Sequence, residues 1–450
     1  MTGIDRARLK TLMEREEARF AAERPKSRAL FDRARRSLLS GVPMNWMVKW
    51  AAPFPIFVHE ARGARFTDVD GHRYVDFCLG DTGSMLGHSP PAAVEAMSEQ
   101  LRRGITFMLP TEDAVFVGEE LRRRFGLPYW QIAMTATDAN RFTIRMARHI
   151  TERPRILIFN GCYHGTVDET LVTLKDGVAR SKRGNIGPAV DPVTTTRVVE
   201  FNDLPALEAA LSARDVACVL AEPAMTNVGI ILPDPGFHEA LRDLTRRTGT
   251  LLIIDETHTI CTGPGGYTAA HHLQPDILTI GKPIASGVPA AAYGISQQVA
   301  DAILARTTIE DSDVGGIGGT LSGNALAMAA MRATLQQVMT EAAYARTIPL
   351  ARRFALGVEQ VIRSAALPWH VVVLGNRVEY QFRAGAPRNG SEAEAAMDWP
   401  LDRFLHLYAM NRGILMTPFH NMALIAPETT AEDVDHHTQV FAESVRELLG

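Results

Sequence analysis

The pattern of apolar and polar positions predicts a sheet of buried strands separated by helices. From Pro90 onward, short apolar runs bounded by turn residues alternate with stretches in which apolar residues recur at helical spacing. Short apolar runs of this kind are typical of parallel strands that are buried on both faces. The alternation therefore predicts a doubly wound α/β sheet. The strand candidates are 156–159, 217–221, 251–254, 277–280 and 291–295.

The N-terminal part of the chain has a different pattern. Residues 5–40 are rich in Arg, Glu and Ala and place apolar residues such as Leu9 at helical spacing, which predicts a surface helix available to pack on a partner subunit. The alternating stretch 64–77 predicts a hairpin that turns at Asp70 and Gly71. After residue 325 a long helix pattern leads into further strand patterns near 370–382 and 414–425.

Two of the apolar runs end in charged residues of opposite sign. The run 251–254 is followed directly by Asp255, and the run 277–280 is followed by Gly281 and Lys282. The carboxyl ends of strands in an open α/β sheet face the ligand crevice, so both side chains are predicted to face one pocket. A lysine amine can hold pyridoxal phosphate (PLP) as an imine while a carboxylate keeps its ring nitrogen protonated. The alternative is that both are strand-end charges that face water.

Composition narrows the class of protein without identifying it. The 450 residues are 46% hydrophobic and 22% charged, which suits a globular chain with a large and a small domain. A formal net charge of −4 gives no reason to expect nucleic acid. We expect no membrane partner, because no apolar run has the length of a membrane span and the first residues lack a signal-peptide core. The four cysteines are widely separated, so we expect reduced thiols and a cytoplasmic location.

The strand-end residues also carry a family resemblance. The run that begins at Asp255 (DETHT) and the run that ends at Lys282 (TIGK) resemble the motif of class III (omega-type) PLP-dependent aminotransferases, which include glutamate-1-semialdehyde aminomutase. The resemblance extends from roughly Phe54 to Ile425. It implies a PLP-dependent transferase of fold type I, with a large, mostly parallel sheet domain and a smaller α+β domain. It further implies that both chain ends build the small domain, which places the boundaries at 1–75, 76–324 and 325–450.

A helix N-terminus after residue 134 is the candidate phosphate site. Small and hydroxyl residues precede a helix pattern there, and free backbone N–H groups at a helix start attract anions. Relatives carry Ser-Gly-Thr-Glu-Ala-Asn at this point and bind the cofactor phosphate, which implies this role for Thr135, Ala136 and Thr137. Ala136 replaces a glycine, so backbone binding requires that it avoid positive φ. The alternative is simple N-capping by Thr137 or Asp138.

The resemblance places further side chains around the cofactor ring. Tyr163 is expected to stack on the ring, with a core tyrosine as the alternative, and His164 is expected to support the site. Glu222 is expected near the ring, where a structural salt bridge is the alternative. Thr257 is expected beneath the ring, since alternation along a strand would give it the same face as Asp255.

The stretch from Gly318 to Asn324 resembles the family segment Gly-Gly-Thr-x-Ser-Gly-Asn. In that family the threonine reaches the phosphate of the neighbouring subunit, which implies a homodimer with shared active sites and a cofactor-binding role for Thr320. The alternative is a flexible glycine linker.

Other motifs are set aside. The glycine-rich stretch 263–266 is not placed between a strand and its helix as a dinucleotide loop requires. We expect His271 and His272, as well as the stretch from Asp433 to His437, to form solvated surface, because neither has matched metal-ligand partners. We therefore predict no metal site.

The substrate is less well specified. Some relatives hold a substrate carboxylate with an arginine in segments that here carry Trp46 and Phe419. Lys49, Arg377 and His420 remain as possible carboxylate partners, and we expect Trp46, Lys49, Phe419 and His420 to bind substrate. An apolar, aromatic entrance suggests bulky amines, ketones or aryl-bearing amino acids.

The sequence therefore predicts a PLP-dependent aminotransferase that moves an amino group between an amine or amino acid and a ketone, aldehyde or keto acid. Lys282 would bind the cofactor as an imine and then serve as general base. Asp255 would hold the ring nitrogen protonated, and Tyr163 would stack on the ring. The alternative is an aminomutase of the glutamate-1-semialdehyde type, which completes both half-reactions on one molecule. A third hypothesis is a non-catalytic protein that keeps the fold, although Lys282 and Asp255 argue against it.

Overall fold

The computed structural model describes residues 4–308, 310–311 and 315–450, and it divides into two compact units. The sheet unit comprises residues 91–341 and 387–395, and the terminal unit comprises the chain up to Pro90 together with 342–386 and 396–450. The sequence analysis places its boundaries at 75/76 and 324/325 instead. The sheet unit continues past 324 because helix α11 (Ala325–Ala333) packs on α3 (Pro91–Arg103) and α4 (Glu112–Phe125).

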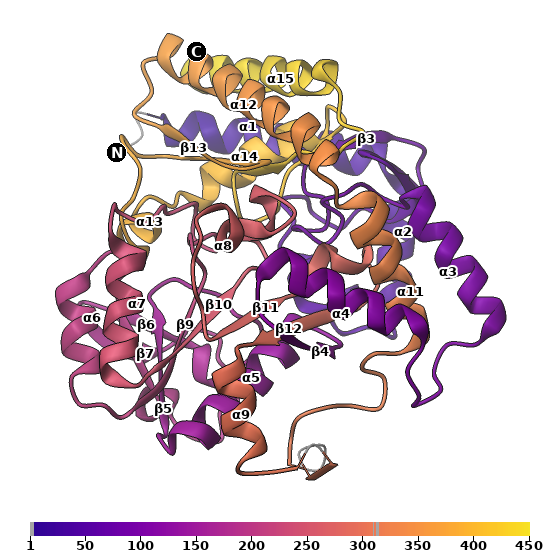
Figure 1. Ribbon diagram of the computed structural model, residues 1–450. Helices are drawn as coiled ribbons and strands as arrows, with labels where there is room; N and C mark the ends of the chain where they lie inside the picture. Colours follow the sequence, from indigo (N-terminus) through magenta and orange to yellow (C-terminus); the bar gives the residue numbers. More distant parts are fainter. Residues whose placement is uncertain (1–3, 309, 312–314) are drawn as a thin grey trace. The chain divides into compact units, whose positions relative to one another are not determined.

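The sheet unit is built on seven strands in the order β4-β12-β11-β10-β9-β5-β8 (Figure 1). Strand β12 runs antiparallel to both neighbours, and the other strand pairs are parallel. This confirms the prediction of a doubly wound, mostly parallel α/β sheet. The strands are β4 (Tyr129–Ala133), β5 (Arg155–Phe159), β8 (Thr196–Val199), β9 (Val216–Ala221), β10 (Leu251–Asp255), β11 (Ile277–Ile280) and β12 (Ala291–Ile295).

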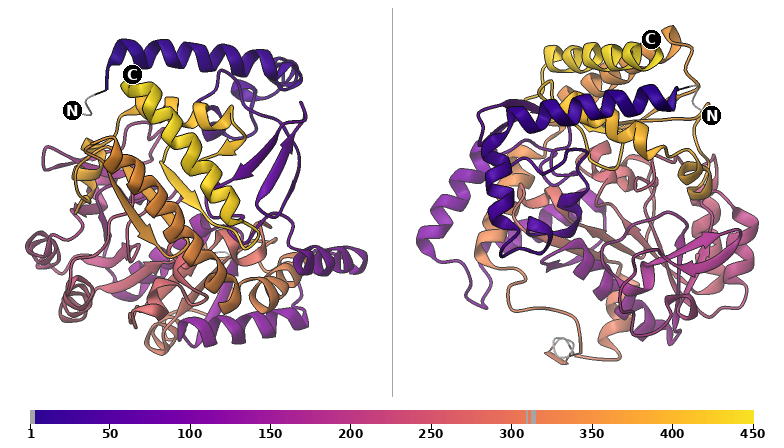
Figure 2. Two further views of the ribbon diagram at one scale, coloured as in Figure 1. Left: turned by 90° about the horizontal axis from the view of Figure 1, so that it is seen from above. Right: turned by 180° about the vertical axis from the view of Figure 1, so that it is seen from behind.

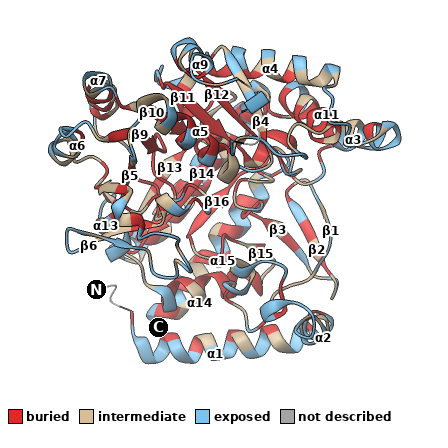
Figure 3. Ribbon diagram, turned by 90° about the horizontal axis from the view of Figure 1, so that it is seen from below, coloured by how far each residue is buried: buried red, intermediate tan, exposed pale blue. Residues whose placement is uncertain are grey.

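Strands β9, β11 and β12 are buried along their whole length, and β5 and β10 are buried from their second residue onward, as their continuous apolar runs predict (Figure 3). The sequence analysis missed β4 and β8, which are the two edges of the sheet. Edge strands are partly solvated, and here they carry polar residues such as Gln131 and Arg197, so neither forms an apolar run.

Helices cover both faces of this sheet. Helix α5 (Ala136–Thr151) packs on β9 to β12 beside α9 (Gln297–Leu304), and α7 (Phe237–Thr248) packs on β10 beside α6 (Leu204–Leu211). Helix α5 connects β4 to β5, in one direction along the sheet, whereas α6 connects β8 to β9 and α7 connects β9 to β10, in the other direction. Because crossover connections are right-handed, α5 lies on one face of the sheet and α6 and α7 lie on the other (Figure 1). The remaining named helices and strands of the unit are η3 (Asp168–Thr170), β6 (Val172–Lys175), β7 (Val178–Ser181), η4 (Pro192–Thr194), η5 (Thr259–Thr262), α8 (Gly266–Ala270), η6 (Lys282–Ala285), η7 (Thr334–Val338) and α13 (Gly390–Ala395).

The terminal unit joins both ends of the chain in one α+β core. Strands β2 (Arg65–Asp68) and β3 (Arg73–Asp76) form the predicted antiparallel hairpin. The two sheets have the orders β1-β2-β3-β15 and β13-β14-β16. The other elements are η1 (Leu39–Gly41), η2 (Asn45–Val48), β1 (Val58–Arg62), α12 (Glu341–Ser364), β13 (His370–Leu374), β14 (Arg377–Gln381), α14 (Trp399–Met410), β15 (Ile414–Leu415), β16 (Met422–Leu424) and α15 (Ala431–Leu449).

The predicted N-terminal helix is two helices, α1 (Arg6–Glu23) and α2 (Pro25–Ala34). Pro25 starts the second helix because proline fits the first helical turn but not a helix interior. Leu9 and Leu12 are buried, and α1 contacts α14 and α15 (Figure 2). The apolar side of α1 is therefore covered by its own chain.

The C-terminal helix corrects one sequence interpretation. Asp435 and His436 are exposed as expected, but Asp433 and His437 are buried. Asp433 forms a capping box with Thr430 at the start of α15. The prediction of solvated surface was wrong for these two residues, because they lie on the face of the helix that packs into the core.

Two further findings concern the described residues. No helix among them is long and apolar enough to cross a membrane. The four cysteines are buried, and none of them is paired in a disulfide.

We predict that His437 makes the protein acid-sensitive. Its ring stacks on Phe354 at 4.1 Å, and burial, together with nearby His436 and His406, lowers its pKa to about 3. In the unfolded chain histidine titrates near 6.5, so as the pH falls from there toward 3 the unfolded state gains a proton that the folded state cannot take. The free energy of unfolding should fall by about 1.4 kcal/mol per pH unit from this group alone.

The test compares urea unfolding between pH 7.5 and 4.5 for the native chain and for His437→Phe, which keeps a ring in the core. The pH slope should be shallower in this variant. The matched control is His59→Phe, which alters an exposed histidine in β1 and should keep the native slope. Equal slopes for the native chain and His437→Phe would contradict the prediction.

Candidate active site at the strand ends of the sheet unit

Asp255 ends β10 and is the centre of a buried hydrogen-bond network. One carboxylate oxygen accepts hydrogen bonds from His164 Nδ1 and Asn140 Nδ2, both at 2.9 Å, and the other accepts from the Thr257 backbone N–H at 3.0 Å. Burial alone would raise the pKa of Asp255, but the protonated His164 ring and the other two donors lower it to about 2. The side chain is therefore an ionised carboxylate that is only 3% exposed.

The network continues into the sheet and into α5. Asn140 also donates to the His164 backbone carbonyl, and its own side-chain oxygen accepts from Thr279 Oγ1 at 2.7 Å. Burial disfavours the charged form of His164, but the nearby Cys162 sulfur and Asp255 favour it, and its pKa is raised to about 10. Asp255 thus faces a protonated imidazole that compensates its charge.

Lys282 follows β11, the strand that pairs with β10. Its backbone has φ 48°, the left-handed region, directly before Pro283. Such a conformation costs a non-glycine residue about 1–2 kcal/mol. Its Nζ lies 2.7 Å from His258 Nε2, on the turn that leaves β10. Lys282 and Asp255 therefore lie at the ends of adjacent parallel strands, and their meeting in one pocket stays a prediction.

The N-terminus of α5 adjoins this cluster. A Cβ on Gly281 would lie 3.0 Å from Ala136 Cβ, so the absence of a side chain allows the backbone before Lys282 to approach the helix start closely. Ala136 is helical, and the departure from glycine that we noted in the sequence is accommodated. The N-cap is Thr135, whose side chain accepts from the Asp138 N–H, so the alternative of capping by Thr137 or Asp138 was wrong.

Thr137 is held by the loop after β5. Its Oγ1 accepts from the Thr166 N–H at 3.2 Å, and a Cβ on Gly165 would lie 2.0 Å from that oxygen. Gly165 also has φ 84°, so only glycine suits this position. The loop that carries Tyr163 and His164 is thereby fixed against the first turn of α5.

The other predicted site residues of the sheet unit are placed as follows. Tyr163 is 45% exposed. Glu222 is buried and accepts a hydrogen bond from Thr226 Oγ1 at 2.5 Å. Thr257 is buried. We expected strand alternation to place it on the same face as Asp255, but β10 ends at Asp255, so the position of Thr257 is set by the turn that follows. Thr320 is exposed, directly after Gly318 and Gly319, both of which have positive φ.

The predicted substrate residues lie in the terminal unit and form a cluster there. Trp46 meets Phe419 edge-on at 6.2 Å, and Lys49 Nζ lies 5.4 Å from the centre of the Phe419 ring. His420 is buried and lies 3.2 Å from Glu379. Arg377 is fully buried, 3.9 Å from Asp81. Of the three cations considered for a substrate carboxylate, Lys49 is the exposed one.

Sequence reasoning assigned no role to Asn140, His258 or Thr279. Asn140 lies one turn into α5 from Ala136, and helical spacing could have placed it on the same face. His258 is part of the motif after Asp255. Thr279 pairs with Asp255 across β10 and β11, a register that the sequence does not contain.

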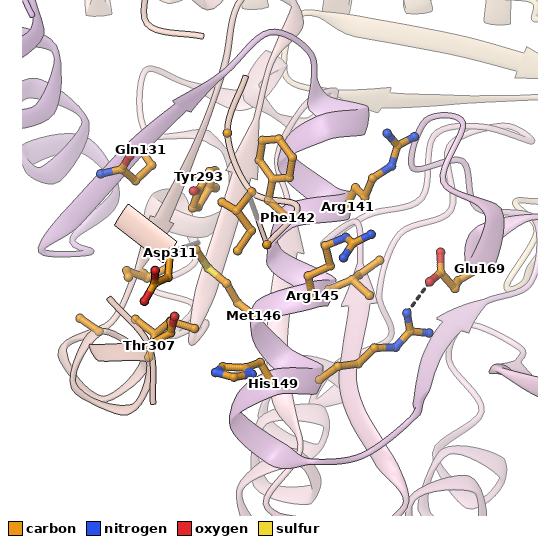
Figure 4. Close-up of a pocket in the computed structure, with 18 of the residues that line it drawn as sticks. Gln131, Arg141, Phe142, Arg145, Met146, His149, Glu169, Tyr293, Thr307 and Asp311 are labelled. Atoms are coloured by element: carbon orange, nitrogen blue, oxygen red, sulfur yellow. Dashed lines mark hydrogen bonds and ion pairs between the residues drawn. The ribbon is translucent and has the colours of Figure 1, made fainter. Parts of the chain in front are cut away.

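A separate cavity of about 1380 Å³ lies along the second half of α5 (Figure 4). Its lining includes Arg141, Arg145 and His149 from the helix and Tyr293 from β12, and Arg148 at its edge pairs with Glu169. Within the described part of the chain, its lining includes none of the predicted site residues. It is therefore distinct from the strand-end cluster.

Comparison with known proteins gives consistent matches. A family model described as Aminotransferase class-III matches residues 46–445. A protein named glutamate-1-semialdehyde 2,1-aminomutase from Sorangium cellulosum is 34% identical over 430 residues, which cover 94% of this chain and 96% of that protein. These matches confirm the resemblance inferred from the strand-end motifs.

Solved structures agree. The crystal structure of a glutamate-1-semialdehyde-aminomutase from Pseudomonas aeruginosa PAO1 has a TM-score of 0.97 and 51% identity, and the match covers 99% of this chain and 100% of that one. A Lys-to-Ala variant of such an enzyme, in complex with PMP, matches equally well. An omega-transaminase from Sphaerobacter thermophilus has a TM-score of 0.85 and 28% identity, covering 94% of this chain and 98% of its own.

We predict that Asn140 and Thr279 are energetically coupled. Asn140→Ala removes a hydrogen bond to the ionised Asp255 and leaves Thr279 Oγ1 without its acceptor, so the free energy of unfolding should fall by about 1–3 kcal/mol. In the background of Thr279→Val the same change should cost less, with a coupling energy of at least about 0.5 kcal/mol.

The measurement is a double-mutant cycle by urea unfolding at pH 7. Thr143→Ala is the matched control, since Thr143 is also buried in α5 but bonds only to the Asn140 backbone carbonyl. It should show no coupling to Thr279→Val. Strictly additive costs for Asn140→Ala and Thr279→Val would refute the network.

Proposed function

We propose that this chain, which belongs to the class III aminotransferase family, acts as an aminomutase of the glutamate-1-semialdehyde type. It is an enzyme of fold type I, and its cofactor is pyridoxal phosphate. The observation that carries the proposal is the 51% identity, over 99% of this chain, to the aminomutase from Pseudomonas aeruginosa. The main prediction from sequence was transfer between two molecules, and the comparisons support its alternative better.

The strand-end cluster fits the cofactor. Asp255 is a buried, ionised carboxylate, which suits a protonated ring nitrogen as its cationic partner. The start of α5 offers backbone N–H groups that have no partner within the helix, which suits a phosphate. Tyr163 is 45% exposed, and an aromatic ring suits stacking on the flat cofactor. Thr257 Oγ1 is buried without a hydrogen-bond partner among the described residues, so a polar ligand atom would satisfy it.

We assign the roles accordingly. When bound, PLP supplies an aldehyde that combines with amines and a ring that accepts electrons from the carbon next to the substrate nitrogen. Lys282 supplies the amine that would hold the cofactor, and its free Nζ would then move a proton to and from the substrate carbon. Asp255, held by His164 and Asn140, would keep the ring nitrogen protonated. Thr135, Ala136 and Thr137 would bind the phosphate.

Other predicted residues complete this assignment. Tyr163 would stack on the ring, and Thr257 would lie beneath it. His164 would act through Asp255, which it contacts directly. Glu222 is anchored by Thr226 on the turn after β9 and would lie near the ring.

We propose that a second copy of the chain completes the site through Thr320. An exposed threonine after two glycines with positive φ suits a segment that reaches another subunit. Exposed apolar side chains lie close to this segment. One is its neighbour in the sequence, and the others belong to the stretch 105–109, which is joined to the end of the segment by a hydrogen bond from the Ala325 N–H to the Ile105 carbonyl. Such exposure suggests a protein interface. These side chains are Ile105, Phe107, Met108, Leu109 and Leu321. The four buried thiols suit the cytoplasmic location that we propose.

A second candidate function is transfer of an amino group between an aryl amine and a keto acid. The contact between Trp46 and Phe419 in the terminal unit favours it, because aromatic side chains suit bulky apolar substrates. The same strand-end cluster would serve both reactions, so only the number of substrates separates them.

We predict that the cofactor-loaded protein converts glutamate-1-semialdehyde, without any added amino acceptor, into the isomer with the amino group moved from carbon 2 to carbon 1. Product is followed by chromatography. Lys282→Ala should abolish turnover and the visible absorption of the bound cofactor, while Lys26→Ala, an exposed lysine, should change neither. Turnover that appears only with an aryl amine and an added keto acid would support the second candidate instead.

We predict that Lys49 binds the substrate carboxylate. A charge-assisted contact to the carboxylate would be equally strong in the ground state and in the transition state. Its loss therefore raises KM and leaves kcat unchanged, and we expect Lys49→Ala to raise KM about tenfold. The control is Lys10→Ala in α1. An unchanged KM for Lys49→Ala would exclude this role.

A further inference from the structure

We infer that His258 is a positioning residue for Lys282, and that it stabilises the protonated side chain of this lysine by accepting a hydrogen bond from Nζ. The inference rests on the proposed function only for the role of Lys282. The observation behind it is the 2.7 Å distance between Lys282 Nζ and His258 Nε2.

The chemistry of the two groups determines the direction of this hydrogen bond. An ammonium has three N–H donors and no acceptor, and an imidazolium likewise only donates, so two cations could not form the contact. At neutral pH an ordinary lysine holds its proton far more tightly than an ordinary imidazole. In the arrangement that we propose, Nζ donates to the unprotonated Nε2 of a neutral ring, whose proton is on Nδ1.

The backbone holds His258 in place for this contact. His258 caps the short helix η5, and its carbonyl accepts from the Cys261 N–H at 3.2 Å. The adjoining Glu256 is buried and accepts hydrogen bonds from Thr259 Oγ1 and from the Tyr267 and Thr268 N–H groups. The Glu256 N–H in turn donates to the Thr279 carbonyl on β11. The turn that carries His258 is therefore tied to the strand that leads to Lys282.

This geometry has a consequence for proton transfer. When Nζ takes a proton from the substrate carbon, an N–H bond forms on Nζ, the C–H bond breaks with its electron pair left on the carbon, and the lysine becomes an ammonium. A hydrogen bond to the charged form favours that form. His258 would therefore lower the barrier to taking the proton and would keep Nζ on the side of the site where it must return the proton.

The test begins with the 450-residue chain without cofactor, in which the Lys282 amine is not held as an imine. The sequence has only six lysines, so acetylation by acetic anhydride at pH 8 can be followed for each by mass spectrometry; they are Lys10, Lys26, Lys49, Lys175, Lys182 and Lys282. Only the unprotonated amine reacts. In His258→Leu the rate at Lys282 should rise several-fold, while the other five rates stay unchanged. His258→Gln, whose side-chain oxygen also accepts, should restore the native rate.

Kinetics of the loaded enzyme give the second measurement. His258→Leu should lower kcat about tenfold, as expected for loss of one hydrogen bond to a charged group, with KM unchanged and a larger deuterium isotope effect at the substrate carbon. His258→Gln should retain most of kcat. His271→Leu, at an exposed histidine stacked on Tyr267, is the matched control and should behave as the native enzyme.

The two measurements separate this inference from the proposed function. An unchanged acetylation rate at Lys282 in His258→Leu would overturn the inference, whatever the enzyme's substrate. A raised rate that is restored by Gln would support it even if the protein proved to be an intermolecular aminotransferase. Circular dichroism of each variant checks that it is folded, and His258→Ala, which also lacks an acceptor, takes the place of His258→Leu if that variant does not fold.

Discussion

A single buried negative charge, the Asp255 carboxylate, constrains the rest of the sheet unit. An ionised carboxylate that is only 3% exposed is very costly unless it is hydrogen-bonded and its charge is compensated. His164 supplies the compensating charge, and Asn140 and the Thr257 backbone supply further hydrogen bonds. These donors come from the loop after β5, from α5 and from the turn after β10, so the charge is tolerated only when three separate segments of the fold are in place.

Helix α5 connects this charge to the proposed phosphate site. Ala136 begins the helix and Asn140 lies one turn later, which corresponds to about 6 Å along the axis. The same rigid element therefore offers free N–H groups at its start and a hydrogen bond to Asp255 from its side. Close backbone approaches at Gly165 and Gly281 fix the neighbouring loops against it. A ligand with a phosphate at one end and a basic ring nitrogen at the other would meet a site whose dimensions are set before it binds.

The backbone at Lys282 shows what this arrangement costs. The left-handed conformation before Pro283 is unfavourable, and it persists because packing of Gly281 on α5 and the contact with His258 hold it. The proposed aminomutase reaction and the alternative transfer between two molecules need the same lysine and the same carboxylate. In the proposed assignment the sheet unit would supply these two groups, and Lys49, Trp46 and Phe419 of the terminal unit are candidate substrate contacts.

The sequence by itself determined the features that depend on local pattern. Continuous apolar runs located the five central strands, and a turn motif located the hairpin at Asp70. The strand-end rule placed Asp255 and Lys282 at the ends of adjacent parallel strands, and their shared role at a cofactor stays a proposal. The family motif supplied the cofactor class. These predictions succeeded because burial on both faces of a strand and the direction of parallel strands leave a direct mark on the order of residues.

Only the tertiary structure decided the contacts between distant segments. It identified β4 and β8, whose half-exposed positions carry no apolar run, and it placed His437 in the core of the terminal unit. It also brought Asn140 and Thr279 to Asp255, and His258 to Lys282. A hydrogen bond between residues far apart in the chain depends on strand register and on the angle at which a helix crosses a sheet, and both are set by packing of the whole unit and not by any one stretch of sequence.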